Sequence, residues 1–483
     1  MPSITIIGLG PGNPQLLTRE AWDALTNARE VYVRTARHPT VSGFPAALTV
    51  HAFDEIYEAT ERFEQVYVQI AERILELAAR PEGVVYAVPG HPNVAEASVG
   101  LIRQKAAERG WPVKLIAGLS FIEPALEALG VDALPQLQLA DAVELAARHH
   151  PTFHPDAPAL IAQLYSRALA SDVKLTLMNQ YPDEHPVRMV HAVGTPDEMV
   201  EDLPLYEIDR SPHIAHLTSL YVPPLPQTSA FESFQETIAH LRAPEGCPWD
   251  REQTHLSLRR YLLEETYEVL AALDAEDTEA LRGELGDLLL QIVLHSQIAV
   301  EEGEFSLAEV IAEVQAKMIR RHPHVFGDVA VSGAGEVVHN WEQIKAAERN
   351  GQAKPDLGVL GEVPPGLPAL AQAETYQKRA AKVGFDWPDV SGVKAKITEE
   401  IEEIETAEED TRAHEVGDLL FAVVNWARWL KVEPETALRE ANARFARRFR
   451  HVEQAAQARS RELKKMTLAE LDELWESAKA QGL

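Results

Sequence analysis

Cysteine is almost absent from this chain of 483 residues, which contains a single one, Cys247. One thiol makes neither an internal disulfide nor a thiolate metal cage, so a reducing compartment is the simplest interpretation. No uninterrupted apolar run approaches the roughly 18 residues that a membrane span needs, and no charged segment followed by an apolar core opens the chain. We therefore expect a soluble, cytoplasmic protein without a membrane partner.

Basic residues are also scarce, because 45 Lys and Arg stand against 75 Asp and Glu, giving a net charge of −30. This balance argues against a nucleic-acid-binding surface. It still permits a polyanionic small substrate, provided that metal ions supply the positive charge. The chain is 46% hydrophobic, which is enough for large cores, and its length predicts about three domains.

The first part of the chain has the pattern of an α/β sheet. Residues 3–12 read as a buried strand that runs into a glycine-rich turn, and short apolar strands recur at 31–33, 84–88 and 113–116 with helical stretches between them. Glycine in such a turn lets a ligand approach the backbone. A proline-rich segment, 223–229, then interrupts all regular structure and predicts the end of this domain.

The later part of the chain repeats one spacing of carboxylates. Positions i, i+1 and i+4 of a helix lie within an arc of roughly 100°, and positions i and i+3 also share a face, so each cluster points its carboxylates one way. Two such helices side by side make one acidic pocket. The first set is Glu264, Glu265 and Glu268 with Glu284 and Asp287, and the second is Glu399, Glu400 and Glu403 with Glu415 and Asp418.

The second helix of each pair is apolar nearly all round, which predicts that it is buried. Buried carboxylates that repel one another need cations, and oxygen ligands without nearby Cys or His indicate Mg²⁺ or Mn²⁺. The alternative is a solvated acidic face, which residues 398–410 alone would equally suggest. Recurrence of the same five positions in two segments favours the metal site.

Four segments of the first domain resemble the tetrapyrrole methylase family, and most closely its YabN-like subset. They are Gly8-Leu-Gly-Pro-Gly12, Pro89-Gly-His-Pro92, Ala117-Gly-Leu-Ser-Phe121 and Leu175-Thr-Leu-Met-Asn-Gln-Tyr-Pro182. The resemblance implies an α/β domain over 1–222 that binds S-adenosylmethionine. The residues expected to line that cofactor pocket are Gly8, Gly10, Gly12, Gly90, His91 and Ser120. Val33-Arg34-Thr35 stands where the family commonly has an Asp, and this departure leaves methyl transfer open.

The rest of the chain resembles the MazG family of all-α nucleoside triphosphate pyrophosphohydrolases. Besides the two acidic sets, the resemblance includes Cys247-Pro-Trp-Asp250, Gln253-Thr-His255 and Arg320-Arg-His-Pro-His-Val-Phe326. It implies two MazG-like helical domains, at 230–345 and 367–483, that form a homodimer. It also implies Mg²⁺-dependent cleavage of a nucleoside triphosphate to the monophosphate and pyrophosphate.

By the same resemblance, basic residues of the second copy bind the triphosphate. Glu399 is the candidate that orients or deprotonates the attacking water, and Asn425 places an amide on an apolar helix where a nucleotide can use it. We expect this second copy to be the main catalyst, with the first either active or a dimerisation half. The carried-over binding residues are Lys396, Arg444, Arg448, Trp475 and Lys479, of which Arg444 replaces the usual Lys.

Two other functions stay open at this point. One is a methyltransferase in which the first domain acts on a tetrapyrrole and the helical repeats serve for assembly. The other is a non-catalytic sensor of nucleotide or adenosylmethionine. Complete acidic sets in both copies favour hydrolysis, because degenerate copies would be expected to lose a carboxylate.

Overall fold

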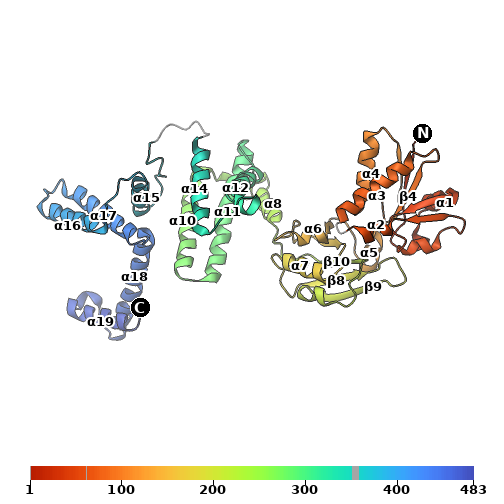
Figure 1. Ribbon diagram of the computed structural model, residues 1–483. Helices are drawn as coiled ribbons and strands as arrows, with labels where there is room; N and C mark the ends of the chain where they lie inside the picture. The colour runs from red at the N-terminus through yellow and green to blue at the C-terminus, as the bar shows by residue number, and fades with distance from the viewer. Residues whose placement is uncertain (1, 61–62, 351–357) are drawn as a thin grey trace. The chain divides into compact units, whose positions relative to one another are not determined.

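The computed structural model of the chain describes residues 2–60, 63–350 and 358–483 (Figure 1). The chain divides into two compact units, Met1–Glu252 and Gln253–Leu483. The division into three domains that we expect from the sequence stays a prediction.

The first unit begins with a parallel five-stranded sheet in the order β3-β2-β4-β1-β5. Alternate residues of β1 face opposite sides. Ile6 packs in the core under α3 and α4, and Ile7 packs in the core beside α1. The strands are β1 (Ile4–Gly8), β2 (Glu30–Val33), β3 (Thr49–Ala52), β4 (Val84–Val88) and β5 (Val113–Ile116), and the helices are α1 (Arg19–Asn27), α2 (Asp54–Ala59), α3 (Phe63–Ala78) and α4 (Ala97–Glu108). The α/β prediction for this part of the chain is confirmed.

A second five-stranded sheet follows in the same unit, in the order β6-β7-β10-β8-β9. Its β6–β7 pair is parallel and the others are antiparallel. The core beneath it is built by Ile161, Met189 and Leu220 from the strands and by Val173 from a helix. The elements are α5 (Ile122–Leu129), β6 (Gln138–Asp141), α6 (Ala142–Ala146), β7 (Ala159–Ala162), α7 (Arg167–Leu177), β8 (Pro186–His191), β9 (Met199–Pro204) and β10 (Thr218–Val222).

The proline-rich segment 223–229 contains no helix or strand, as predicted, but the first compact unit continues past it to Glu252. Strand β10 ends at Val222, and the next element is α8 (Phe231–Arg242), followed by α9 (Pro248–Glu252). The start of α8 is tied back to the sheet domain, because the Asp156 carboxylate accepts hydrogen bonds from the backbone N–H groups of Ser229 and Ala230. Desolvation is the largest single contribution and raises the pKa of Asp156, but hydrogen bonds from the Ser233 hydroxyl and from these two backbone groups together hold that pKa below its ordinary value.

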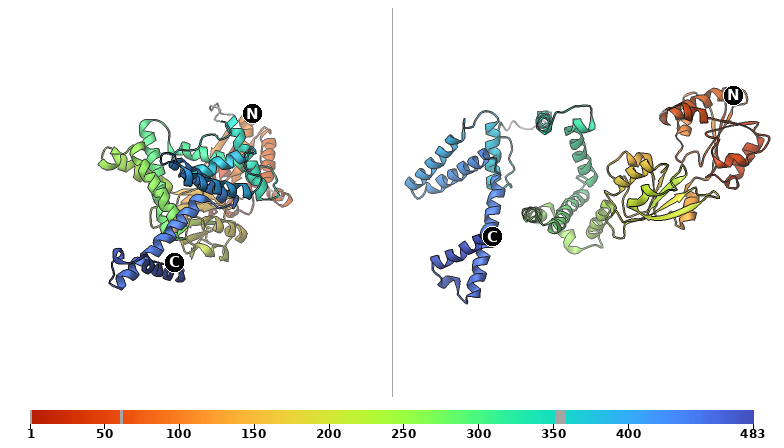
Figure 2. Two further views of the ribbon diagram at one scale, coloured as in Figure 1. Left: turned by 90° about the vertical axis from the view of Figure 1, so that its left-hand side faces the viewer. Right: turned by 60° about the horizontal axis from the view of Figure 1, so that its bottom comes forward.

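The second unit is helical throughout its described residues. Helices α10 and α11 pack side by side, as do α16 and α17 (Figures 1 and 2). Thr254 caps α10 in a reciprocal capping box with Ser257. The helices are α10 (His255–Asp274), α11 (Thr278–Glu302), α12 (Leu307–Arg321), α13 (Pro323–Phe326), α14 (Ala334–Asn350), α15 (Ala369–Ala381), α16 (Val390–Thr406), α17 (Arg412–Trp429), α18 (Pro434–Ala458) and α19 (Leu468–Ala480).

The prediction that the second helix of each acidic pair is buried is wrong for the single chain. One face of α11 is buried through Val293, Leu294 and Ile298, but Leu285 and Ile292 are exposed. Helix α17 is more open still, and its exposed apolar residues are Leu420, Phe421, Val423 and Trp426. Each helix has neighbours from its own chain on part of its circumference only, so an apolar sequence all round leaves an uncovered face. None of the described helices combines the length and apolar character needed to cross a membrane.

Candidate functional site: two sets of acidic helix pairs

The acidic set of the second copy is organised around one lysine on α16. The Lys396 ammonium lies 2.9 Å from a Glu399 oxygen, 2.8 Å from a Glu400 oxygen and 4.0 Å from a Glu403 oxygen. Hydrogen bonds to Glu400 and then Glu399 raise the pKa of Lys396 above its ordinary value. The lysine therefore stays charged, and it confirms that these three glutamates share one side of the helix.

Three carboxylates of this copy converge between α16 and α17. Oxygens of Glu400, Glu415 and Asp418 lie within 4.8 Å of one another. Glu400 is only 3% exposed, and its second oxygen is buried without a hydrogen-bond partner in the described structure. Desolvation raises the pKa of the neighbouring Glu403, and the charges of Glu400, Glu399 and Glu415 add to this, while Lys396 opposes it. One ammonium cannot neutralise five carboxylates, so the set has the charge and the free oxygens to hold a divalent cation.

The first copy builds a similar set from α10 and α11 without a lysine. Oxygens of Glu265, Glu268 and Glu284 lie within 4.8 Å of one another, with Glu264 and Asp287 exposed beside them. No ion pair to any of these five residues occurs within residues 2–60, 63–350 and 358–483. Desolvation and the charges of its neighbours, Asp287 first, raise the pKa of Glu265, and Glu284 shifts the same way. The repulsion among these carboxylates is therefore compensated less than in the second set, where Lys396 supplies a positive charge, and a bound metal ion would stabilise the first set more.

The raised pKa of Glu265 leads to a prediction about stability. Above that pKa the Glu265 carboxylate is ionised in both states, but only in the folded protein is it desolvated and repelled by its neighbours. Glu265 therefore destabilises the fold at neutral pH. Glu265→Gln should raise the midpoint of thermal unfolding of chelator-treated protein at pH 7 to 8. The difference should shrink as the pH falls towards the ordinary value near 4.5, where both states bind the proton. Added Mg²⁺ should stabilise the parent more than the variant. Equal midpoints at every pH would contradict the repulsion.

Apart from Lys396 on α16, the basic residues expected to bind the triphosphate lie on α18 and α19 and form a separate group. Arg448 donates to the Leu483 carbonyl oxygen at 2.6 Å and lies over the Trp475 ring at 5.7 Å. Arg444 pairs with Glu440, and Lys479 pairs with Glu476. In the described part of the chain no hydrogen bond or ion pair joins this group to the carboxylates on α16 and α17. The structure thus brings Arg448 and Trp475 together but does not bring them to the acidic set of the same chain.

Asn425 lies on α17, and its side chain is already engaged. Its amide oxygen accepts hydrogen bonds from the Arg428 guanidinium at 2.7 and 3.2 Å, and Arg428 also donates to Asp386 at 2.6 Å. The amide nitrogen is left as the group that Asn425 can offer a ligand. Sequence reasoning missed Arg428 as the residue that orients Asn425, although the spacing of three on a helix was a usable signal.

In the first domain the predicted glycines bring three turns into contact. A side chain at Gly8 would lie 2.5 Å from the Gly118 nitrogen and 2.6 Å from the Gly90 oxygen, so glycine there serves backbone packing. Gly10 and Gly90 exchange backbone hydrogen bonds of 2.9 and 3.3 Å. Gly90 has a φ of +64° and open space where a side chain would stand. That space, at the carboxyl ends of β1 and β4, is where a cofactor can approach the backbone.

The other predicted cofactor residues serve local structure. Gly12 avoids a contact of 2.8 Å with the Thr195 methyl group. Ser120 is buried and donates to Glu123 at 2.6 Å, and the His91 ring accepts from the Asn93 backbone N–H at 3.1 Å. The hydroxyl of Ser120 is therefore occupied within its own turn.

The fold and site define a class of protein: an α/β domain whose glycine turns meet at the ends of β1 and β4, followed by helices that carry two metal-type carboxylate sets. Residues 3–209 match the family of tetrapyrrole (corrin/porphyrin) methylases, and residues 253–326 match the MazG nucleotide pyrophosphohydrolase domain. The second match lies on the first acidic set.

Relatives cover the whole chain and its helical part. The uncharacterized protein YabN of Bacillus subtilis is 44% identical over 491 residues, which are 99% of this chain and 98% of YabN. The nucleoside triphosphate pyrophosphohydrolase/pyrophosphatase MazG of Thermotoga maritima is 45% identical over 52% of this chain and 95% of its own length. The nucleoside triphosphate pyrophosphohydrolase of Escherichia coli K12 is 46% identical over 51% and 95%. The chain belongs to the MazG family, in the YabN-like form with a tetrapyrrole methylase domain ahead of the MazG region.

Proposed function

We propose that the chain is a Mg²⁺-dependent nucleoside triphosphate pyrophosphohydrolase that converts ribo- or deoxynucleoside triphosphates to monophosphates and pyrophosphate. The observation that carries this proposal is the convergence of Glu400, Glu415 and Asp418 beside Lys396, an acidic set too negative to stand without a cation. Relatives named as nucleoside triphosphate pyrophosphohydrolases, similar over half the chain, support it.

Four carboxylates would hold the metal: Glu400, Glu403, Glu415 and Asp418. Their donor set is all oxygen, which suits Mg²⁺ and also Mn²⁺. The buried Glu400 oxygen without a partner is the clearest vacant donor. When bound, Mg²⁺ neutralises phosphate charge and lowers the pKa of a coordinated water.

The remaining residues then have separate tasks in the reaction. Glu399 accepts a proton from the water that attacks the α-phosphorus, while the bond to the bridging oxygen breaks and pyrophosphate leaves. Lys396 holds Glu399 and Glu400 in place through its two short contacts and supplies positive charge near the phosphates. Glu264, Glu265, Glu268, Glu284 and Asp287 of the first copy would hold a metal of their own, and we assign the main turnover to the second copy.

We further propose that the chain works as a homodimer. The apolar faces left open on α11 and α17 belong to the helices that carry the carboxylates, and burying them would also exclude water from the site. Arg444, Arg448, Trp475 and Lys479 are not joined to the carboxylates of their own chain. A second chain is the occupant that can supply these basic side chains. With the Asn425 amide on α17, they would complete a triphosphate pocket.

The glycine turns at the ends of β1 and β4 favour a second activity, binding of S-adenosylmethionine by the first domain. Its support is the open space at Gly90 between the ends of β1 and β4 and the match to the methylase family. No residue there identifies itself as a catalytic base, so we propose cofactor binding without assigning a methyl acceptor. Cys247 is free, which agrees with a location in the reducing cytoplasm.

One experiment tests these proposals together. The purified chain is incubated with a panel of ribo- and deoxynucleoside triphosphates, with Mg²⁺ or with chelator, and the products are separated by chromatography. We expect pyrophosphate and monophosphate only where Mg²⁺ is present. Release of orthophosphate, or no cleavage of any triphosphate, would reject the hydrolase. A parallel calorimetric titration with adenosylmethionine should show binding to the same preparation whatever the outcome for triphosphates.

A further inference from the structure

Two histidines of the second unit are locked together at the end of the first helix pair. His255 is the first residue of α10, and His295 lies on α11. Their ring planes are 6° apart and their centroids 5.0 Å apart, and the two Nδ1 atoms are 2.7 Å from each other, so the rings meet edge to edge. At this distance one Nδ1 must carry a proton and the other must accept it. Neither nitrogen is therefore available to another ligand.

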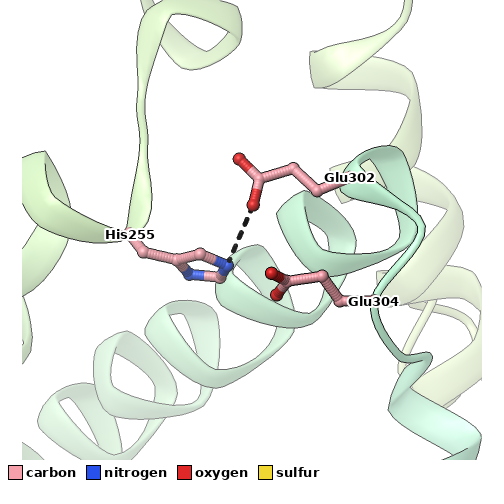
Figure 3. A group of neighbouring side chains, drawn as sticks. All are labelled: His255, Glu302 and Glu304. Carbon is pink, nitrogen blue, oxygen red and sulfur yellow. Dashed lines mark ion pairs between the residues drawn. The ribbon is translucent and has the colours of Figure 1, made fainter.

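The orientation of this pair leaves Nε2 of His255 as its free ring nitrogen. A metal ion on Nε2 of His255 requires the arrangement in which Nδ1 of His255 carries the shared proton and Nδ1 of His295 accepts it. His255 then has a lone pair on Nε2, the tautomer of a metal-ligating histidine held by a neighbour. Nε2 of His255 lies 3.9 Å from a Glu302 oxygen (Figure 3).

The end of α11 presents two carboxylates to that nitrogen. Glu302 is the last residue of the helix, and Gly303 follows in the left-handed conformation with a φ of +72°. The backbone N–H of Glu304 returns to the Ala299 carbonyl at 2.9 Å, which closes the helix end. As a result, oxygens of Glu302 and Glu304 and a ring nitrogen of His255 lie within 4.8 Å of one another (Figure 3).

The charges at this helix end are of the wrong sign for a bare helix. A helix C-terminus carries partial negative charge and is stabilised by Lys, Arg or protonated His nearby. The last turn of α11 contains no basic residue, and it bears Glu302 with Glu304 just beyond. Within the described ranges neither glutamate pairs with a Lys or an Arg, and the one ion pair recorded for them is that of Glu302 with His255. A cation bound here would offset both carboxylates and the helix end together.

We propose that His255, Glu302 and Glu304 form a zinc site, separate from the two acidic sets and with His295 as the positioning residue. One imidazole and two carboxylates leave an open coordination position. The nitrogen ligand distinguishes this site from the oxygen-only sets and favours Zn²⁺ over Mg²⁺. Ligands of a tetrahedral Zn²⁺ ion stand about 3.3 Å apart, given bonds of about 2.0–2.1 Å. The exposed Glu302 and Glu304 side chains rotate on metal binding, which brings ligand atoms that now lie within 4.8 Å of one another to this shorter spacing.

The test is zinc binding by the full chain in excess Mg²⁺, which occupies the oxygen-only sets. Metal-free protein is titrated with Zn²⁺ against a chromophoric chelator. His255→Asn and Glu302→Gln should each weaken the zinc affinity by about 10-fold or more, and His295→Leu should weaken it by roughly 10- to 100-fold. Glu301→Gln is the matched control, since the same change one residue away should leave the affinity unchanged. Visible absorption of bound Co²⁺ should change in His255→Asn and stay unchanged in Glu301→Gln.

Two results would overturn the zinc site. His255→Asn and Glu302→Gln might both bind Zn²⁺ as tightly as the parent, or Mg²⁺ might displace the bound zinc completely. In either case His255 would be only the ion-pair partner of Glu302. Because His255 begins α10, its variant may fold poorly, and circular dichroism of each variant checks this. The exposed Glu302 and Glu304 then decide the question, because Glu302→Gln and Glu304→Gln leave the helix cap intact.

Discussion

Glu403→Gln is expected to lower the rate of pyrophosphate release by on the order of 100-fold or more, because losing a ligand of the metal weakens the electrostatic stabilisation of the charge that develops on the phosphates. Glu403 faces Lys396 from the same helix side as Glu399 and Glu400, and the amide keeps its shape but loses its charge as a metal ligand. Because Glu403 is exposed, the far-ultraviolet circular dichroism and the melting midpoint should stay close to those of the parent.

The matched control for this substitution is one residue away. Glu402 lies on α16 but on another side of the helix and belongs to neither acidic set, so Glu402→Gln should keep full turnover. Glu268→Gln, the corresponding change in the first copy, separates the two sites. Loss of turnover in Glu268→Gln with retention in Glu403→Gln would reverse the assignment of the main catalyst. Equal rates in all three variants would remove the carboxylates from the reaction.

The second large effect is expected from Leu420→Asp on the open face of α17. Leu420 is 54% exposed in the single chain, so a folded monomer tolerates the charge, whereas a dimer that buries this face does not. We expect the variant to elute as a monomer in size-exclusion chromatography with light scattering. Its triphosphate turnover should fall at least about 10-fold, because the basic residues of the partner chain would no longer reach the carboxylates on α16 and α17.

Leu468→Asp provides the comparison for this experiment. Leu468 is 82% exposed at the start of α19, and a carboxylate in a first helical turn is favourable. It should leave both mass and turnover unchanged. A dimeric Leu420→Asp protein, or a monomeric one with full activity, would contradict the role of the α17 face.

Local signals in the sequence predicted most of the fold. The apolar strand segments at 31–33, 84–88 and 113–116 and the linker at 223–229 match the structure within a residue or two, because period and proline placement act over a few residues. Helices α16 and α17 lie at Val390–Thr406 and Arg412–Trp429 and pack against each other, so the second acidic set is divided between two neighbouring helices as predicted. Caps such as Thr254 follow from the same short-range rules.

Burial and side-chain pairing were harder to predict, because they depend on distant partners. An all-round apolar helix reads as buried, yet α17 is open in one chain because its covering surface is not on that chain. The MazG resemblance placed Lys396 among the triphosphate-binding residues, but only the fold shows its contacts with Glu399 and Glu400 and the burial of Glu400. The sequence predicted that the Asn425 amide is available to a nucleotide. Its hydrogen bond from Arg428 depends on side-chain rotamers, which the helical repeat of the sequence does not determine. The roles of individual site residues stay predictions for the experiments above.

Helix α11 fixes the distance between the first acidic set and the proposed zinc site. Positions 284 and 302 are 18 residues apart on it, which at 1.5 Å per residue is about 27 Å. Ions held at its two ends are too far apart to share a ligand or a phosphate group. Binding at one end should therefore not affect binding at the other, and the number of ions bound per chain should be the sum of the two sites. A paramagnetic ion placed at one end would therefore report the position of the other as a distance along a single rigid rod.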